Sequence, residues 1–428
     1  MWPRLVVNKI LRKRLGSNNF VADIPSIDSN ETVLQVPSSF SRTSFCINRH
    51  DTYNYKVFVS TWNVGGVAPD HDVDLEDLLD TCNDSSCDIY VFGFQEIVPL
   101  KASNVLGSEN CKISSEWNSL IRDALNKRQT SHTVGKNLKD LFATEENLKE
   151  SSNFPQEFQC IISKQMVGIL ISVWVRSDLR PYIHHPSVSC VGCGIMGCLG
   201  NKGSVSVRFQ LHETSFCFVC CHLASGGREG DEKHRNSNMS EILSRSSFPR
   251  GSSYNLPRKI LDHDRVILLG DLNYRISLAE ETTRSLVDVG EWNALLANDQ
   301  LRMELADGQV FQDWQEGEIK FAPTYKYFLN SDEYYGCVQR RKGEKKRAPA
   351  WCDRIVWYGK GLKQHLYSRS ESKLSDHRPV KAIFSAQVTK SHACENFSNF
   401  FLSDRLDRVT QFASTDDFMC KHRSSFHI

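Results

Sequence analysis

Five short apolar segments follow one another between residues 158 and 224, and they limit the folds that this chain can adopt. Their sequences are FQCIISKQ, MVGILISVWV, SVSCVGCGI, KGSVSVRFQL and SFCFVCCHLA. Each segment has the length and composition of a β-strand, and short connections separate them. Strands joined in this way pair as hairpins or meanders, so the pattern predicts a mainly antiparallel sheet.

Helical segments interrupt the strands in the rest of the chain. Helical patterns occur at 228–246, 280–289, 291–299 and 301–308, and further strands are expected at 55–65, 88–97, 266–271, 352–359 and 378–388. The regular strand–helix alternation of a parallel doubly wound sheet is not seen. The order of elements predicts an α/β (α+β) fold, in which two mainly antiparallel sheets pack together with helices outside.

The composition is that of an ordinary soluble protein, with 40% hydrophobic and 24% charged residues and a net charge of +1. So small a net charge produces no global field that would attract nucleic acid. The longest apolar run, residues 166–175, is far shorter than the roughly 20 residues that span a bilayer. No secretory signal is visible. We expect a cytoplasmic protein, with a peripheral membrane or nuclear location left open.

Three regions are expected along the chain. Residues 1–50 form a basic, partly flexible arm, residues 51–388 form the main domain with a polar surface insertion near 127–157, and residues 389–428 form a poorly ordered tail. The first turns of the arm combine an apolar face with basic residues. This arm could lie on an anionic membrane or dock on the main domain.

Two Cys-x-x-Cys sequences make a zinc site an alternative to be weighed. They pair Cys190 with Cys193 and Cys217 with Cys220, a spacing that zinc ligands use. The second pair, however, lies in a segment with the pattern of a strand, where residues three apart face opposite sides. Small buried thiols in a reducing compartment are the favoured interpretation.

Polar residues end the apolar strands repeatedly. Asn63, Glu96, His222, Asp271 and Asn273 follow strands, and Asp353, Asp376 and His377 lie beside the last two. Each residue alone has a structural explanation, such as a turn or a helix cap. Polar groups at the mouth of a buried strand are nevertheless unfavourable unless something uses them. Because a sheet gathers its strand ends at one edge, the joint pattern predicts a functional site there.

The oxygen-rich side chains of these strand ends suit a hard cation. Glu96, with Asn63 or Asp376, offers the kind of ligand that Mg²⁺ takes while it keeps several waters. The two histidines could donate hydrogen bonds to a phosphoryl group, and Asp271 could orient or deprotonate a water. Together these roles describe metal-assisted hydrolysis of a phosphate ester.

A series of motifs, in this order, resembles the inositol polyphosphate 5-phosphatases, especially their plant type I group. The motifs are STWNVGG, FGFQEI, LGNKGSVSVRF, HLASG, GDLNYRI, PTYKY, KKRAPAWCDRI and SDHRPV. The combination of GDLNYR with PAWCDRI downstream is highly specific. The similarity covers roughly residues 50–388 and the N-terminal arm.

The resemblance implies the four-layer sandwich shared with DNase I-like nucleases, the endonuclease/exonuclease/phosphatase fold. Residues 51–388 would then be the catalytic domain. The resemblance also implies that Glu96 binds Mg²⁺ with Asn63 nearby. It further implies that Asp271 activates the attacking water, which is positioned with Asn273.

The remaining catalytic roles follow from the same resemblance. His222 and His377 would contact the scissile 5-phosphate, and Asp376 would support the site. Asp353 would orient His377, because a carboxylate that accepts a proton from one ring nitrogen fixes the tautomer and the angle of the imidazole.

Additional cations would distinguish an inositide phosphatase from a nuclease, since a phosphate beside the scissile one needs charge and hydrogen-bond donors. In the family, residues matching Tyr325, Lys326, Lys345 and Arg347 bind the 4-phosphate. Further inositol-phosphate contacts are implied at Asn201, Lys202, Tyr274, Arg275 and Arg354.

The leading hypothesis is a Mg²⁺-dependent phosphatase that acts in phosphoinositide signalling. It would remove the 5-phosphate from phosphatidylinositol 4,5-bisphosphate, from the 3,4,5-trisphosphate, or from soluble inositol polyphosphates. A DNase I-like nuclease would need a broad basic groove, and we expect no nucleic-acid partner. A non-catalytic inositide-binding module would lack Asp271, His377 or Glu96, and all three are present. Peripheral membrane contact is left open.

Overall fold

The computed structural model describes ten ranges of the chain. These are residues 19–23, 50–69, 73, 75–79, 86–99, 111–134, 157–194, 199–250, 256–336 and 347–391. The predicted arm lies outside them except for 19–23 and 50, and the predicted tail lies outside them beyond 391. The predicted insertion overlaps the end of one helix and otherwise lies outside them up to residue 156. These three regions therefore stay predictions.

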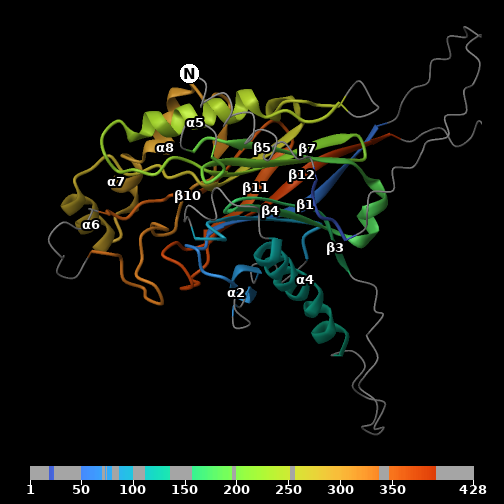
Figure 1. Cartoon of the computed structure of the whole chain (residues 1–428), viewed down its shortest axis with the longest axis horizontal. Coiled ribbons are helices and arrows are strands. Elements are labelled where there is room, and N and C mark those ends of the chain that lie inside the picture. The colour runs from blue at the N-terminus through green and yellow to red at the C-terminus, as the bar shows by residue number, and fades with distance from the viewer. Residues whose placement is uncertain are drawn as a thin grey trace, which may run out of the picture.

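Two six-stranded sheets stack against each other and form the centre of the molecule (Figure 1). The first sheet has the order β11-β12-β1-β2-β4-β3. Its strands are β1 (His50–Asn63), β2 (Ile89–Gln95), β3 (Phe158–Met166), β4 (Ile169–Arg176), β11 (Leu362–Arg369) and β12 (Val380–Ser391). The strands β1 and β2 are parallel, and the other neighbours are antiparallel.

The second sheet has the order β5-β6-β7-β8-β10-β9. Its strands are β5 (Ile183–Gly192), β6 (Gly203–Leu211), β7 (Thr214–His222), β8 (Arg265–Asp271), β9 (Gln315–Glu316) and β10 (Asp353–Tyr358). One neighbouring pair, β7 and β8, is parallel, and the rest are antiparallel. The predicted pair of mainly antiparallel sheets is confirmed.

Helices cover the outer faces of both sheets (Figure 1). The first sheet carries α2 (Glu76–Leu79) and α4 (Cys111–Val134), and the second carries α5 (Asp231–Arg245) and α8 (Gln300–Asp307). Two further helices, α6 (Glu280–Asp288) and α7 (Trp292–Leu296), lie at one end of the sandwich. The order helix, sheet, sheet, helix gives the predicted four layers. Within the described ranges, no helix has both the length and the hydropathy that crossing a membrane requires.

Strand β1 shows how the sequence builds these layers. Val57 and Val59 belong to the core between the two sheets, whereas Phe58 and Trp62 belong to the core under α4. Successive side chains of a strand point to opposite faces, and both faces of β1 are buried between residues 57 and 63. The first half of the strand is more polar and largely exposed, so only the second half lies at the centre of the layers.

The strand register brings the ends of the central strands to one edge, which we call the rim. In the second sheet, Asp271 is paired with His222 of β7 and with Asp353 of β10. In the first sheet, Asn63 is paired with Gln95 at the ends of β1 and β2. Residues far apart in sequence thus reach the same edge through the pairing of the backbone.

Candidate active site

The carboxylate of Asp271 lies at the centre of the rim and is held from three strands. Asn63 Nδ2 donates a hydrogen bond to Asp271 Oδ2 at 2.9 Å. His222 Nε2 lies 3.2 Å from the same oxygen, and the backbone N–H of Asn273 donates to Asp271 Oδ1 at 3.1 Å. The side chain is almost completely buried. These contacts fix the orientation of the carboxylate before any substrate arrives.

The charge of Asp271 is set by competing effects. Burial by itself would raise its pKa, because the charged form loses its water. The hydrogen bond from His222 and the positive charges of His377 and Lys202 outweigh this effect and hold the pKa well below its usual range. Burial lowers the pKa of His222, and the charge of Lys202 acts in the same direction. At neutral pH, Asp271 is therefore ionised and His222 is neutral.

His377 and Asp353 form a buried ion pair next to this centre. His377 Nδ1 lies 2.8 Å from Asp353 Oδ2, and the hydroxyl of Thr324 donates to the same oxygen at 2.7 Å. Burial disfavours the charged imidazole, but the charge and hydrogen bond of Asp353 prevail and raise the pKa of His377 to about 9. His377 is therefore protonated at neutral pH and can donate a hydrogen bond from its second ring nitrogen.

Glu96 and Asn63 offer the oxygen ligands that a divalent cation requires. Glu96 follows β2 with a positive φ of 55°, a conformation that is unfavourable for a residue with a Cβ and that often marks a functional position. Its side chain is 28% exposed, and Oε1 lies 3.7 Å from His222 Nε2. Asn63 Oδ1 accepts a hydrogen bond from Gly65 N at 3.0 Å. This donor set suits a hard cation that keeps several waters.

A second group of possible metal ligands lies in the rim. Donor atoms of Asp271, Asp353 and His377 lie within 4.8 Å of one another. His377 Nδ1 and Asp353 Oδ2 are, however, hydrogen-bonded to each other. The protonated imidazole of this pair would repel a cation, so this group is better described as a carboxylate–imidazole pair than as a metal site.

Asn273 and Arg275 extend the rim away from Asp271. Asn273 has a positive φ of 59°. Its Nδ2 donates to Leu223 O at 3.2 Å, and its Oδ1 accepts from Arg275 Nη2 at 2.6 Å. The guanidinium of Arg275 lies 4.4 Å from the centre of the Tyr325 ring, which in turn lies 4.6 Å from the His377 ring. A row of neighbouring planar groups therefore connects Arg275 to His377, with the Tyr325 and His377 rings tilted by 44°.

Lys326 supplies a cation beside this row. Its Nζ lies 2.5 Å from Asp376 Oδ2 and faces the rings of Tyr325 and Tyr335 at 5.6 and 5.5 Å. Burial alone would raise the pKa of Asp376, but the positive charges of His377 and Lys326 hold it below its usual value. Asp376 is therefore a resident anion next to the lysine.

The other predicted substrate residues differ in where they lie. Lys202 Nζ contacts His222 Nε2, which places Lys202 at the catalytic centre, and burial lowers its pKa to about 8. Asn201 has a buried Oδ1 without a hydrogen-bond partner among the described residues. The charge of Arg347 acts on Tyr325. Lys345 lies outside the described residues.

Two predicted substrate contacts need correction, because both side chains point away from the rim. Tyr274 is fully buried, and its hydroxyl donates to Asn236 Oδ1 at 2.5 Å. Arg354 is also fully buried, and its guanidinium bonds Asp299 at 2.9 Å and Glu316 at 2.6 Å. Arg354 follows a rim residue on a strand, where successive side chains point to opposite faces, and Tyr274 packs in the core under α5. Both support the fold beneath the site.

The structure also excludes the zinc alternative for the four cysteines considered. Cys190 and Cys220 contribute to the core between the sheets, whereas Cys193 and Cys217 contribute to the core under α5. The sheet therefore lies between Cys190 and Cys220 on one face and Cys193 and Cys217 on the other. Four thiolates on opposite faces of a sheet cannot surround one ion with the tetrahedral geometry of zinc.

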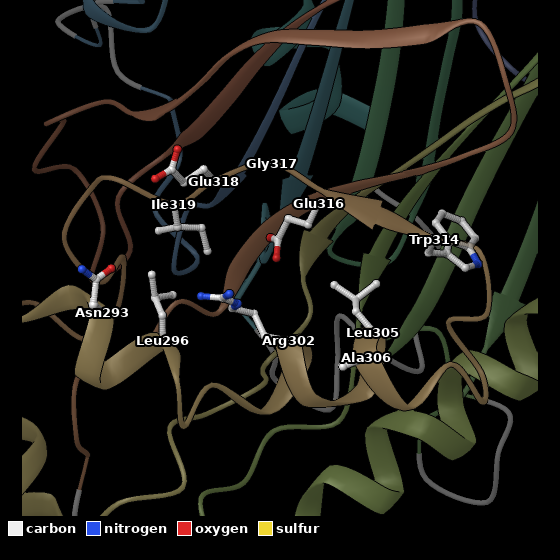
Figure 2. Close-up of a pocket in the computed structure, with 10 residues that line it drawn as sticks. All are labelled: Asn293, Leu296, Arg302, Leu305, Ala306, Trp314, Glu316, Gly317, Glu318 and Ile319. Atoms are coloured by element: carbon white, nitrogen blue, oxygen red, sulfur yellow. The ribbon is translucent and has the colours of Figure 1, made fainter.

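A pocket of about 550 Å³ lies between α7, α8 and β9 (Figure 2). Its lining includes the apolar side chains of Leu296, Leu305 and Ile319 and the charged side chains of Arg302 and Glu316. None of the rim residues described above lines it. The pocket instead borders the buried ion pair behind β10, since Glu316 is the partner of the Arg354 guanidinium.

Sequence reasoning missed two residues that support the site. Thr324 donates to Asp353, and it stands inside the PTYKY motif, which was a usable signal. Gln300 Oε1 accepts from the backbone N of Arg275 at 2.9 Å and from Arg235 Nη2 at 2.7 Å. Gln300 opens the helix α8, 25 residues after Arg275 in the printed sequence. Nothing in the local pattern of the sequence points to it.

The chain is similar to known enzymes over most of its length. A family model for the Endonuclease/Exonuclease/phosphatase family 2 matches residues 60–383. The chain is 64% identical to the Type IV inositol polyphosphate 5-phosphatase 9 of Arabidopsis thaliana, over 97% of this chain and 99% of the relative. It is 45% identical to the Type I inositol polyphosphate 5-phosphatase 8 of the same plant, over 90% of this chain and 86% of the relative. The expected type I subgroup is not supported, since the more similar of these two is designated type IV.

Solved structures show the same relationship. The inositol polyphosphate 5-phosphatase domain of SPsynaptojanin, solved with inositol (1,4)-bisphosphate and a calcium ion, is 28% identical with a TM-score of 0.66. The match covers 96% of this chain and 99% of that domain. A Cimex nitrophorin matches with a TM-score of 0.51 at 18% identity, over 78% of this chain and 99% of the nitrophorin. The latter similarity shows the fold alone.

Proposed function

Because the chain belongs to the inositol polyphosphate 5-phosphatases of the endonuclease/exonuclease/phosphatase family and is a phosphoric monoester hydrolase, we propose that its substrate carries neighbouring 4- and 5-phosphates. We further propose that Mg²⁺ is its cofactor. Phosphatidylinositol 4,5-bisphosphate and soluble inositol 1,4,5-trisphosphate share this arrangement of phosphates. The protein would act in the cytoplasm, with peripheral contact to membranes when the substrate is a lipid.

The observation that carries this proposal is the proximity of an ionised carboxylate, a protonated imidazole and a lysine with its own counter-ion. These groups are Asp271, His377 and the pair of Lys326 with Asp376. The first two are the groups that hydrolysis of a phosphate ester needs. The lysine adds a site for a second phosphate.

Each rim residue has a defined part in the proposed reaction. Asp271 orients the attacking water and accepts its proton as the new O–P bond forms. The bond between phosphorus and the inositol 5-oxygen breaks in the same step, and the leaving oxygen takes up a proton from solvent. His377 donates a hydrogen bond to a non-bridging oxygen of the 5-phosphate and stabilises the charge that develops there. Lys202 and His222 lie on the other side of Asp271 and provide further donors. All of these groups are held by hydrogen bonds in advance, so little reorganisation accompanies the reaction.

Glu96 and Asn63 would hold the metal ion. When bound, Mg²⁺ neutralises charge on the phosphoryl and leaving oxygens. The calcium ion in the SPsynaptojanin structure supports a divalent cation in this family. The oxygen donor set of Glu96 and Asn63 and the partial exposure of Glu96 support a cation site at these residues.

Specificity for the 4-phosphate would come from Lys326. In the described structure its ammonium group pairs with Asp376 and faces two tyrosine rings. A bound 4-phosphate would replace Asp376 as the partner of the ammonium group. Arg347 and Tyr325 lie close enough to interact electrostatically and would complete the binding site.

Phosphate release from two substrates tests the proposal. Purified protein is incubated with vesicles containing phosphatidylinositol 4,5-bisphosphate and, separately, with inositol 1,4,5-trisphosphate, with Mg²⁺ or with a chelator. We expect Mg²⁺-dependent loss of the 5-phosphate, identified from the product. Activity that persists in chelator would contradict the cofactor, and loss of another phosphate would contradict the regiochemistry. The ratio of the two rates distinguishes lipid from soluble substrate.

A further inference from the structure

We propose that Thr324 is a positioning residue for His377: its hydroxyl fixes the Asp353 carboxylate in the orientation that aims the imidazole at the scissile phosphate. The role of His377 towards phosphate rests on the proposed function above. The arrangement of Thr324, Asp353 and His377 does not depend on it.

The geometry places two donors on one oxygen. Thr324 Oγ1 donates to Asp353 Oδ2 at 2.7 Å, and His377 Nδ1 lies 2.8 Å from the same atom. Thr324 and Asp353 are both fully buried. A buried hydroxyl that donates to a carboxylate is among the stronger hydrogen bonds in proteins, because the acceptor is charged.

The other oxygen of the carboxylate has no comparable support. Asp353 Oδ1 is buried and has no hydrogen-bond partner among the described residues. The rotation of the carboxylate is therefore set by its contacts at Oδ2. Without Thr324, the imidazole would be the remaining side-chain partner, and the two groups could turn together.

The backbone places Thr324 in register with the histidine. Thr324 O accepts from the backbone N of Arg378 at 2.8 Å, and Arg378 directly follows His377. The next residue, Tyr325, pairs with His377 and with Ala350 in isolated β-bridges. The hydroxyl is thus anchored to the same backbone segment whose imidazole it helps to orient.

Negative charges around the pair make this hydrogen bond necessary. Asp271 and Asp376 both face His377, and Asp271 also faces Asp353. Burial raises the pKa of Asp353, and the charge of Asp271 adds to this rise, whereas His377 and the Thr324 hydroxyl oppose it. The hydroxyl therefore favours the ionised form of Asp353, in which the carboxylate accepts a proton from His377 Nδ1 rather than carrying one itself.

Two substitutions separate the hydrogen bond from the packing. Thr324→Val keeps the shape and removes the donor, and Thr324→Ser keeps the donor. We expect Thr324→Val to lower kcat about 10- to 100-fold with KM changed less than about twofold. The acidic limb of its pH profile should move by about one pH unit towards neutral, because Asp353 takes up a proton more readily. The kcat of Thr324→Ser should stay within about threefold of the kcat of the unsubstituted protein.

A measurement without substrate keeps this inference distinct from the proposed function. The Nδ1 proton of His377 is followed by NMR against pH in the full chain and is assigned with His377→Gln. We expect the resonance to shift in Thr324→Val and to be restored in Thr324→Ser. If the unchanged protein releases no 5-phosphate, the proposed function fails, but this spectrum still tests Thr324.

Two results would overturn the inference. The first is a Thr324→Val protein with unchanged kcat, pH profile and His377 resonance. The second is an equal loss of activity and of thermal stability in both variants, which would make the contact one of packing. Should Thr324→Val fail to fold, Thr324→Ala serves in the same comparison with Thr324→Ser.

Discussion

Two neighbouring residues of β10 show how one strand serves catalysis and stability at the same time. Asp353 faces the rim, and Arg354 faces the core behind it, and both carry a fully buried charge. The donors on Arg354 are bonded to Asp299, to Glu316 and to Trp351 O. Asp353 instead has one oxygen with two donors and one with no donor among the described residues.

The difference teaches what a reactive charge requires. A buried guanidinium whose donors are paired with carboxylates holds its neighbours in place and has no tendency to exchange protons. The carboxylate of Asp353 accepts a hydrogen bond from an imidazole whose pKa is raised to about 9. Because Asp353 is incompletely paired, the rim can still exchange protons. Arg354 is fully paired and provides rigid support behind it.

Replacing the central carboxylate should give the largest effect on activity. Asp271→Asn keeps the shape of the side chain but removes the charge that orients the water and accepts its proton. We expect kcat to fall at least about 1,000-fold, while the thermal unfolding midpoint remains within a few degrees. Steady-state phosphate release measures kcat, and a thermal melt measures the unfolding midpoint. Retention of more than a tenth of the activity would remove Asp271 from the mechanism.

Breaking the pair behind β10 should give the opposite result. Arg354→Met leaves the buried carboxylates of Asp299 and Glu316 without their cationic partner, which typically costs about 3–5 kcal/mol of unfolding free energy. Urea denaturation measures the loss, and activity per folded molecule should change much less than in Asp271→Asn. Lys320→Met is the control, since Lys320 pairs with Glu318 on the exposed surface, and it should leave the urea midpoint nearly unchanged.

Removing the charge of Lys326 should affect substrate choice rather than chemistry. Lys326→Met deprives the 4-phosphate of its cation, and KM for 4,5-bisphosphorylated substrates should rise about 10- to 100-fold. A substrate with the 5-phosphate alone should be nearly unaffected. The matched control is Lys373→Met, an exposed lysine that pairs with Asp332. An equal loss on both substrates would contradict a site for the 4-phosphate.

The pH dependence should give the smallest effect, and it reports on His377 together with Lys202. Its pKa is raised from an ordinary value near 6.5 to about 9, so the charged form is present throughout the neutral range. Both its hydrogen bond to phosphate and its stabilising contact with Asp353 are lost as pH rises through about 9. We expect kcat/KM to fall between about pH 8 and 10. An unchanged profile up to pH 10 would place a neutral imidazole in the reaction.

The sequence predicted the rim better than the parts that support it. Asn63, Glu96, His222 and Asp271 each follow an apolar strand, and strand pairing alone then gathers them at one edge. The orientation of Arg354 could not be predicted in this way, because a shift of one residue in register exchanges the two faces of a strand. Only the observed pairing of β10 with β8 decides which neighbour reaches the rim.

Several elements of the fold were also missed, and two of them show why. Helix α4 buries Trp117 and Ile121, but its sequence mixes these residues with many polar ones and carries no clear start or stop signal. Strand β11 lies at the edge of the first sheet, and its residues are partly exposed. An edge strand has little of the apolar alternation by which buried strands are recognised.

The pairing of β1 with β12 has a practical consequence for handling this molecule. His50 is paired with Ser391 at one end of these two strands. Thr61 is paired with Val380 at the other end, near the rim. The start of β1 and the end of β12 are therefore neighbours. A short designed linker could join them into a circular chain, which could then be reopened in a surface loop with the rim untouched.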